Sequence, residues 1–101
     1  MNYSYLFVHE AWKEYEEAIS WYAARSVKAA RNFVEEVDIT IGKIVAMPTT
    51  WRNEFEDFYE LKIKKYPFSI IYQINNIERQ ILVTSVFHHS RNPGNKYRRS
   101  A

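Results

Sequence analysis

A regular alternation of apolar and charged residues in the second half of the chain most constrains the fold. Between positions 59 and 64 the apolar residues are Tyr59, Leu61 and Ile63. A side-chain period of two is typical of a β-strand, whose successive side chains point to opposite faces of the sheet. The alternation therefore predicts a sheet with one apolar face, which another layer covers, and one solvated face. The side chains expected on the solvated face are Glu60, Lys62 and Lys64.

Two further strands are expected after this alternation. Residues 68–74 and 80–88 are rich in Ile, Val, Phe and Tyr, which favour strands. Pro67 suits the start of a strand because proline donates no ladder hydrogen bond, and Asn75-Asn76 is typical of a turn. The second half therefore predicts a three-stranded meander.

The first half carries helical patterns after one short strand, expected over residues 3–8. Apolar residues recur every three or four positions between about residues 10 and 24, which is typical of a helical stripe. A second helix begins after Ser26, a good N-cap, and ends before Pro48. The short connection between the two patterns indicates an antiparallel helical hairpin. The stripes consist of Trp12, Tyr15, Ile19 and Tyr22, and of Val27, Ala30, Phe33, Val34, Val37, Ile41 and Ile44.

These elements predict an α+β fold with the order β-α-α-β-β-β. A two-helix antiparallel hairpin packs on one face of a small, mainly antiparallel four-stranded sheet. We expect residues 49–57 to form a loop that Trp51 and Phe55 anchor to the core. Residues 1–101 form a single domain with a basic tail over about residues 90–101.

Composition narrows the class of protein. The chain has no cysteine, which excludes disulfides and thiolate metal sites and favours a reducing compartment. No apolar run approaches the roughly 20 residues that a membrane helix needs. The apolar start Asn2–Val8 is short and Glu10 follows, unlike a signal peptide. We expect a soluble cytoplasmic protein that does not bind membranes.

The net charge of +2 conceals two halves of opposite sign. Residues 1–57 carry six basic and ten acidic side chains, a net charge of −4. Residues 58–101 carry eight basic and two acidic side chains, a net charge of +6. The asymmetry favours an anionic partner for the second half, either nucleic acid or an acidic protein segment. The alternative is a solvated surface with unevenly distributed charge.

Three short stretches carry a family resemblance. They are Trp21-Tyr22, Tyr66-Pro67-Phe68-Ser69-Ile70-Ile71-Tyr72 and Val86-Phe87-His88-His89-Ser90-Arg91-Asn92-Pro93. With the element order, they make nearly the whole chain resemble the RelE/ParE superfamily of bacterial toxins from type II toxin–antitoxin systems. The resemblance implies two helices against one face of the sheet, with the strand at residues 3–8 at an edge or beside the last strand. It also implies a cognate antitoxin protein that lays a helix or strand on the toxin.

The resemblance leaves the target open. RelE-like members cut mRNA on the ribosome without a metal, whereas ParE-like members inhibit DNA gyrase. We expect a growth-arresting toxin that acts on translation as a ribosome-dependent, metal-independent endoribonuclease, with no cofactor. One alternative is a ParE-like, non-enzymatic inhibitor of DNA gyrase. Another is a non-toxic relative that only binds an antitoxin.

RNA cleavage would need a base near the attacking 2′-hydroxyl, cations around the phosphate and an acid for the leaving oxygen. Histidine titrates near neutral pH, and arginine grips phosphate through two bonds. The catalytic candidates are His88, Arg91, Lys62 and Lys64. The candidates for binding RNA or another target are Lys65, Lys96, Tyr97, Arg98 and Arg99.

Each candidate also has a structural interpretation. The lysines of an edge strand can serve only to prevent aggregation. Strand alternation sends His88 and His89 to opposite faces, so at most one reaches a given site, and the sequence leaves open which. Arg91 can brace the tail, and Tyr97 can simply pack.

The pattern departs from the RelE type at one point. Many superfamily members carry an arginine near the start of the strand that here reads Tyr59-Glu60-Leu61. A set of residues that lacks this arginine is common among ParE-like members, which need no catalysis. Our working prediction is that the helices cover the apolar face, and that the four catalytic candidates gather on the uncovered face.

Overall fold

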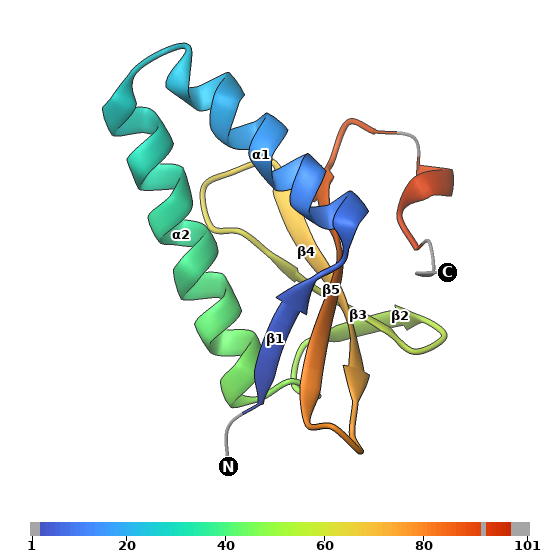
Figure 1. Cartoon of the computed structure of the whole chain (residues 1–101). Coiled ribbons are helices and arrows are strands. Elements are labelled where there is room, and N and C mark those ends of the chain that lie inside the picture. Colours follow the sequence, from blue (N-terminus) through green and yellow to red (C-terminus); the bar gives the residue numbers. More distant parts are fainter. Residues whose placement is uncertain (1–2, 92, 98–101) are drawn as a thin grey trace.

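The computed structural model describes residues 3–91 and 93–97, which form two helices on a five-stranded sheet (Figure 1). The strand order is β1-β5-β4-β3-β2, with β1 parallel to β5 and the other neighbours antiparallel. The α+β class and the place of the first strand, at an edge and beside the last strand, are confirmed. The elements are β1 (Ser4–Phe7), α1 (His9–Ala23), α2 (Val27–Ala46), β2 (Arg52–Phe55), β3 (Phe58–Lys62), β4 (Phe68–Asn75), β5 (Gln80–His88) and the short 3₁₀ helix η1 (Pro93–Asn95).

The helical hairpin covers one face of the sheet, as predicted. Ser26 caps α2: its side-chain oxygen accepts a hydrogen bond from the Ala29 N–H at 2.9 Å. Neither helix of the described chain is long and apolar enough to cross a membrane. The main core joins α1 and α2 to this face, and its fully or nearly fully buried members include Ala11, Tyr15, Phe33, Val37, Ile41, Ile44, Ile63, Ile70, Tyr72, Ile81, Val83 and Val86.

The sheet has five strands because residues predicted as loop contain β2. Arg52 pairs with Glu60 and Phe55 with Phe58, with an irregular register between these pairs. All four residues of β2 are exposed, so its sequence shows no alternation that would reveal a strand. Trp51 packs against the main core as expected, but Phe55 lies on the opposite side of the sheet.

The face away from the helices carries a small apolar cluster of its own. Phe58, Ile71 and Phe87 are buried there, and Tyr97 packs against them. We call this side of the sheet the outer face. The outer face is therefore not uniformly solvated, because the C-terminal segment returns across it.

The main core depends on one aromatic side chain in α2. Phe33 is fully buried and contacts the rings of Tyr22, Tyr66 and Phe68, with centroids 4.9–5.4 Å apart. We expect Phe33→Ala to lower the free energy of unfolding by about 3–5 kcal/mol in urea denaturation. Ile77→Ala, at a side chain that is 93% exposed, should change it by less than about 0.5 kcal/mol. Equal effects of the two substitutions would contradict this packing.

Candidate functional site

The strand register divides the predicted catalytic residues between the two faces. Lys62 pairs with Ser69, which pairs with Phe87 of the outer cluster. His88 instead pairs with Phe68, a member of the main core, and their rings contact edge to face at 4.8 Å. Directly paired residues share a face, so Lys62 and His88 lie on opposite faces. The expected gathering of the four catalytic candidates on one uncovered face is therefore wrong.

His89, the neighbour of His88, is the histidine on the side of Lys62. Its ring Nε2 is hydrogen-bonded to the Ser69 hydroxyl at 2.9 Å, and its backbone N–H donates to the Pro67 carbonyl at 2.9 Å. The Lys62 Nζ donates to the Tyr66 carbonyl at 3.2 Å. These bonds tie the end of β5 to the β3–β4 turn. The question that the sequence left open, which histidine faces the lysine, is answered in favour of His89.

The surroundings of the His89 ring favour its neutral form. Partial burial of the ring and then the positive charge of Lys62 lower the pKa of His89 below its ordinary value of 6.5, although the Glu60 carboxylate acts in the opposite direction. A neutral imidazole accepts protons and hydrogen bonds, so His89 has the protonation state of a general base at neutral pH.

Glu60, which the sequence analysis did not single out as a site residue, organises the outer face. Its carboxylate accepts from the Lys96 Nζ at 2.9 Å and from the Tyr97 hydroxyl at 3.3 Å. The Glu60 side chain is only 10% exposed, so most of the charge of Lys96 is compensated locally. The signal was present in the sequence, since Glu60 alternates with Tyr59 and Leu61, but only the fold brings the tail to it.

Tyr97 packs as well as hydrogen-bonds. Its ring stacks on Phe55 with centroids 4.9 Å apart and lies 5.6 Å from Phe58. Burial and the negative charge of Glu60 raise the pKa of Tyr97, so its hydroxyl remains protonated. Phe55 is 42% exposed, which leaves an aromatic edge open beside the tail. We call the surface formed by Phe55, Lys96 and Tyr97 the tail surface.

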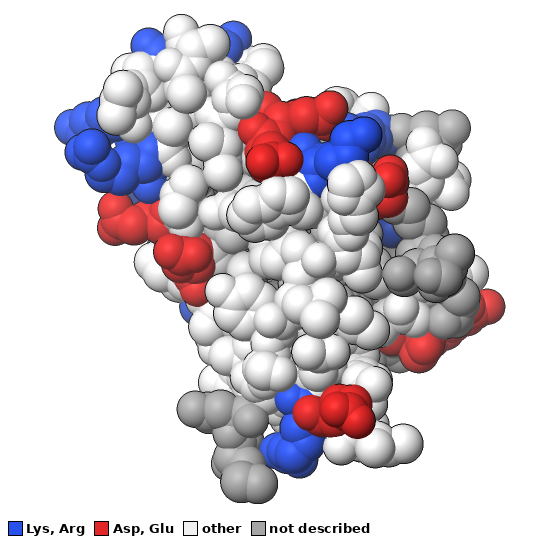
Figure 2. Space-filling view, viewed as in Figure 1, with Lys and Arg blue, Asp and Glu red and all other residues white. Residues whose placement is uncertain are grey.

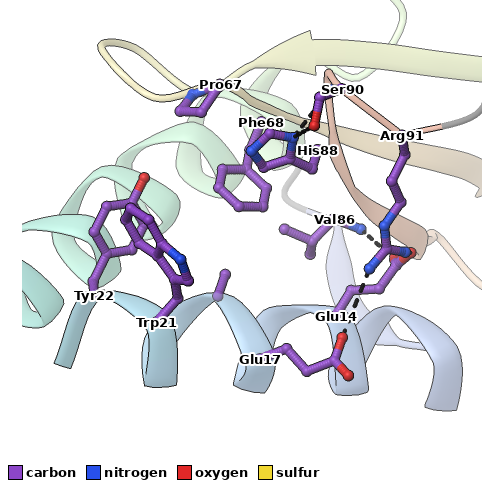
Figure 3. Close-up of a pocket in the computed structure, with 11 residues that line it drawn as sticks. Glu14, Glu17, Trp21, Tyr22, Pro67, Phe68, Val86, His88, Ser90 and Arg91 are labelled. Carbon is purple, nitrogen blue, oxygen red and sulfur yellow. Dashed lines mark hydrogen bonds and ion pairs between the residues drawn. The ribbon is translucent and has the colours of Figure 1, made fainter. Parts of the chain in front are cut away.

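His88 lines a groove of about 370 Å³ on the other side of the sheet, between α1 and the ends of β4 and β5 (Figure 3). Trp21 and Tyr22 from α1 lie across this groove from Phe68 and His88 (Figure 3). The His88 Nδ1 accepts the Ser90 backbone N–H at 3.0 Å. A backbone amide can only donate, so the His88 ring accepts through Nδ1 in this bond.

Arg91 also lies on the helix side of the sheet. Its guanidinium donates to the Glu14 carboxylate at 2.6 Å and lies 3.7 Å from Glu17 (Figure 3). The Glu14 side chain is only 7% exposed, whereas that of Glu17 is 68% exposed. The structure therefore gives Arg91 the bracing contacts that the sequence offered as the alternative to phosphate binding.

The other basic candidates that lie within the described residues are not among the residues that contact Glu60, His89 or Glu14. Lys64 is exposed in the turn after β3. Lys65 borders a shallow hollow with Glu35 and Glu36 of α2, away from the outer face. Arg98 and Arg99 lie outside the described residues.

Surface charges are interspersed rather than separated by half. In the view of Figure 2, basic and acidic side chains adjoin one another near the two ends of the molecule, and uncharged surface lies between them. The opposite charges of the two halves of the sequence thus do not produce one continuous basic face in this view. Within residues 3–91 and 93–97, no three His, Cys, Asp or Glu side chains gather closely enough to hold a metal ion.

Comparison with known proteins shows a similar fold and identifies the family. The fold is similar to that of a solved structure described as "Chromosomal ParDE TA system from P. aeruginosa", with a TM-score of 0.70 and 12% identity. The match covers 85% of this chain and 95% of that chain. Residues 5–93 match the family described as "ParE toxin of type II toxin-antitoxin system, parDE", so the chain belongs to the ParE toxin family. That membership implies an antitoxin partner. No curated protein matches the chain.

The outer face offers a direct test of its electrostatics. Lys62→Ala should raise the pKa of His89 toward 6.5, because the charge that opposes ring protonation is lost. Lys64→Ala removes a lysine that does not contribute to the shift and should leave the His89 titration unchanged. The titration is followed by NMR of the imidazole resonances. An unchanged His89 midpoint in Lys62→Ala would show that the two groups do not interact.

The same shift makes folding depend on pH. The unfolded chain takes up the His89 proton at higher pH than the folded chain, because the folded pKa is the lower one. The contribution of His89 to stability is therefore fully present above pH 6.5 and falls as the pH drops from 6.5 toward the folded pKa. Urea unfolding at stepped pH should show that the free energy of unfolding falls less over this window in Lys62→Ala than in the unmodified protein.

Proposed function

We propose that this ParE-family chain is an antitoxin-controlled toxin that arrests growth by binding DNA gyrase, without chemistry of its own. The observation that carries the proposal is that three of the candidate cations are already bound by groups of the protein itself. Arg91 is bound by Glu14, Lys96 is bound by Glu60, and Lys62 donates to a backbone carbonyl. Cleavage of RNA calls for cations directed at the phosphate as negative charge develops. Cations held by carboxylates suit a preformed protein surface better.

The tail surface is the part of the molecule that best fits a protein target. Tyrosine, tryptophan and arginine dominate the binding energy of protein interfaces, and rigid aromatic rings lose little entropy on binding. Phe55 and Tyr97 stack at 4.9 Å, and the Glu60 carboxylate fixes Lys96 and Tyr97. The tail surface therefore presents ordered aromatic area beside a cation, which favours binding over catalysis.

A second candidate function is metal-independent mRNA cleavage on the ribosome, and one cluster favours it. The lowered pKa of His89 favours its neutral form, and its ring is hydrogen-bonded to Ser69, which is paired with Lys62 on the adjacent strand. A neutral histidine near a lysine could take the proton of a 2′-hydroxyl while the lysine approaches the phosphate. In this version His89, rather than His88, is the catalytic histidine, and Glu60 and Lys62 complete the site.

The deciding experiment follows both targets in one culture. The toxin is induced in a bacterial host without antitoxin, while plasmid supercoiling and transcript ends are measured. We expect negative supercoiling to fall while transcripts remain whole. Cut transcripts with normal supercoiling, abolished by His89→Ala, would instead establish the second function. Normal growth would identify a relative that only binds its antitoxin.

The tail surface can be tested with purified gyrase. Phe55→Ala removes an exposed aromatic side chain and should raise the toxin concentration for half-inhibition of supercoiling roughly tenfold or more. Ile77→Ala removes an apolar side chain that is 93% exposed at the β4–β5 turn, and should leave inhibition unchanged. Circular dichroism of both variants checks that the fold is retained. Undiminished inhibition by Phe55→Ala would place the target contact elsewhere.

A further inference from the structure

We propose that Glu14 is a positioning residue that sets the place of the C-terminal segment, and through it the tail surface. The consequence for toxicity rests on the function proposed above, in which the tail surface contacts the target. The positioning itself rests only on the contacts of Glu14. No motif of the sequence pointed to this residue, which lies in α1 among other acidic side chains.

The need for Glu14 arises where β1 ends. The register of β1 with β5 covers only Gln80 to Val83, and the Val8 N–H then bonds the Val83 carbonyl at 3.0 Å. Strand β5 continues to His88, so within the described residues its edge away from β4 has no neighbouring strand over this last part. Backbone donors at a buried strand edge must find other partners, since leaving one unpaired is costly.

The Glu14 carboxylate takes the place of the missing strand. Its Oε1 accepts from the Val86 backbone N–H at 2.9 Å and from the Ser85 hydroxyl at 2.9 Å. Its Oε2 accepts from the Arg91 guanidinium at 2.6 Å. One carboxylate thus joins α1, the open edge of β5 and Arg91, which lies beyond the end of that strand.

Burial makes this arrangement specific. A carboxylate with 7% exposure is stable only when donors satisfy it, so its orientation is determined by its partners. Glu17 lies 3.7 Å from the same guanidinium, but its side chain is exposed and its contact with Arg91 is screened by solvent. Of these two carboxylates, Glu14 is the one able to hold Arg91 in a single position.

Arg91 in turn begins the segment that builds the tail surface. The Arg91 N–H bonds the His88 carbonyl at 3.0 Å, and η1 (Pro93–Asn95) then leads to Lys96 and Tyr97. Those two side chains are held by Glu60 on the outer face. Carboxylates therefore bind the segment near both of its ends: Glu14 binds Arg91 on the helix side, and Glu60 binds Lys96 on the outer face.

The test separates positioning from simple stabilisation. Glu14→Gln keeps the size of the side chain and an acceptor for Val86, but removes the charge that holds Arg91. Glu17→Gln is the matched control, because it neutralises the exposed carboxylate beside the same guanidinium. The Tyr97 ring is monitored by NMR through its contacts with Phe55 and Phe58, which an effect on stability alone would not move. Gyrase inhibition and antitoxin binding are measured on the same samples.

We expect Glu14→Gln to shift the Tyr97 resonances and to weaken gyrase inhibition roughly tenfold, with Glu17→Gln unchanged in both. Unmoved Tyr97 resonances in Glu14→Gln would overturn the positioning role, whatever the inhibition. Moved Tyr97 resonances with full inhibition would support the positioning role and count against the tail surface as the target contact. If Glu14→Gln does not fold, Arg91→Met replaces it, because this variant leaves the bonds of Glu14 to β5 in place. The Tyr97 resonances and the inhibition of gyrase then decide in the same way.

Discussion

The pairing register of β3, β4 and β5 is the constraint on which the rest of the molecule depends. Side chains alternate between faces along a strand, so one residue of register decides whether a group faces the helices or the tail. The register pairs Lys62 with Ser69 and Phe68 with His88. The main core fills the helix side and leaves a smaller cluster outside. The fold thus separates two adjacent histidines and gives each a different neighbourhood.

Some of the opposite charges of the two halves of the chain are paired within the molecule. Arg91 from the basic half is bound by Glu14 from the acidic half, which links the C-terminal segment to α1. Lys96 finds Glu60, one of the two acidic residues in its own half. A composition that favoured an anionic partner therefore describes, in part, intramolecular ion pairs. Charge counts along a chain do not distinguish the two uses, because pairing depends on which surfaces the fold brings together.

Most of the architecture could be predicted from local patterns, and the site could not. The helical stripes and the alternation around Leu61 report on buried faces, which periodicity reveals, although Trp12 and Val27 of the stripes are exposed. Strand β2 could not be predicted because all four of its residues are exposed and it pairs only at the edge of the sheet. The roles of His88 and Arg91 depended on register and on contacts between distant elements, which no local pattern contains. Glu14 meets Val86 across 72 positions of sequence, so nothing near it in the sequence predicts its role.

The proposed function depends on how the outer face uses its cations. Binding and cleavage would differ in whether the cations of the outer face are held by carboxylates or are free to meet a phosphate. Here Glu60 holds Lys96 and fixes the Tyr97 hydroxyl, which converts potential phosphate ligands into parts of an ordered surface. A neutral residue at position 60 would remove the carboxylate that holds Lys96 and would leave a more positive outer face. Under the function proposed above, the acidic residue in β3 thus favours recognition of a protein over attack on RNA.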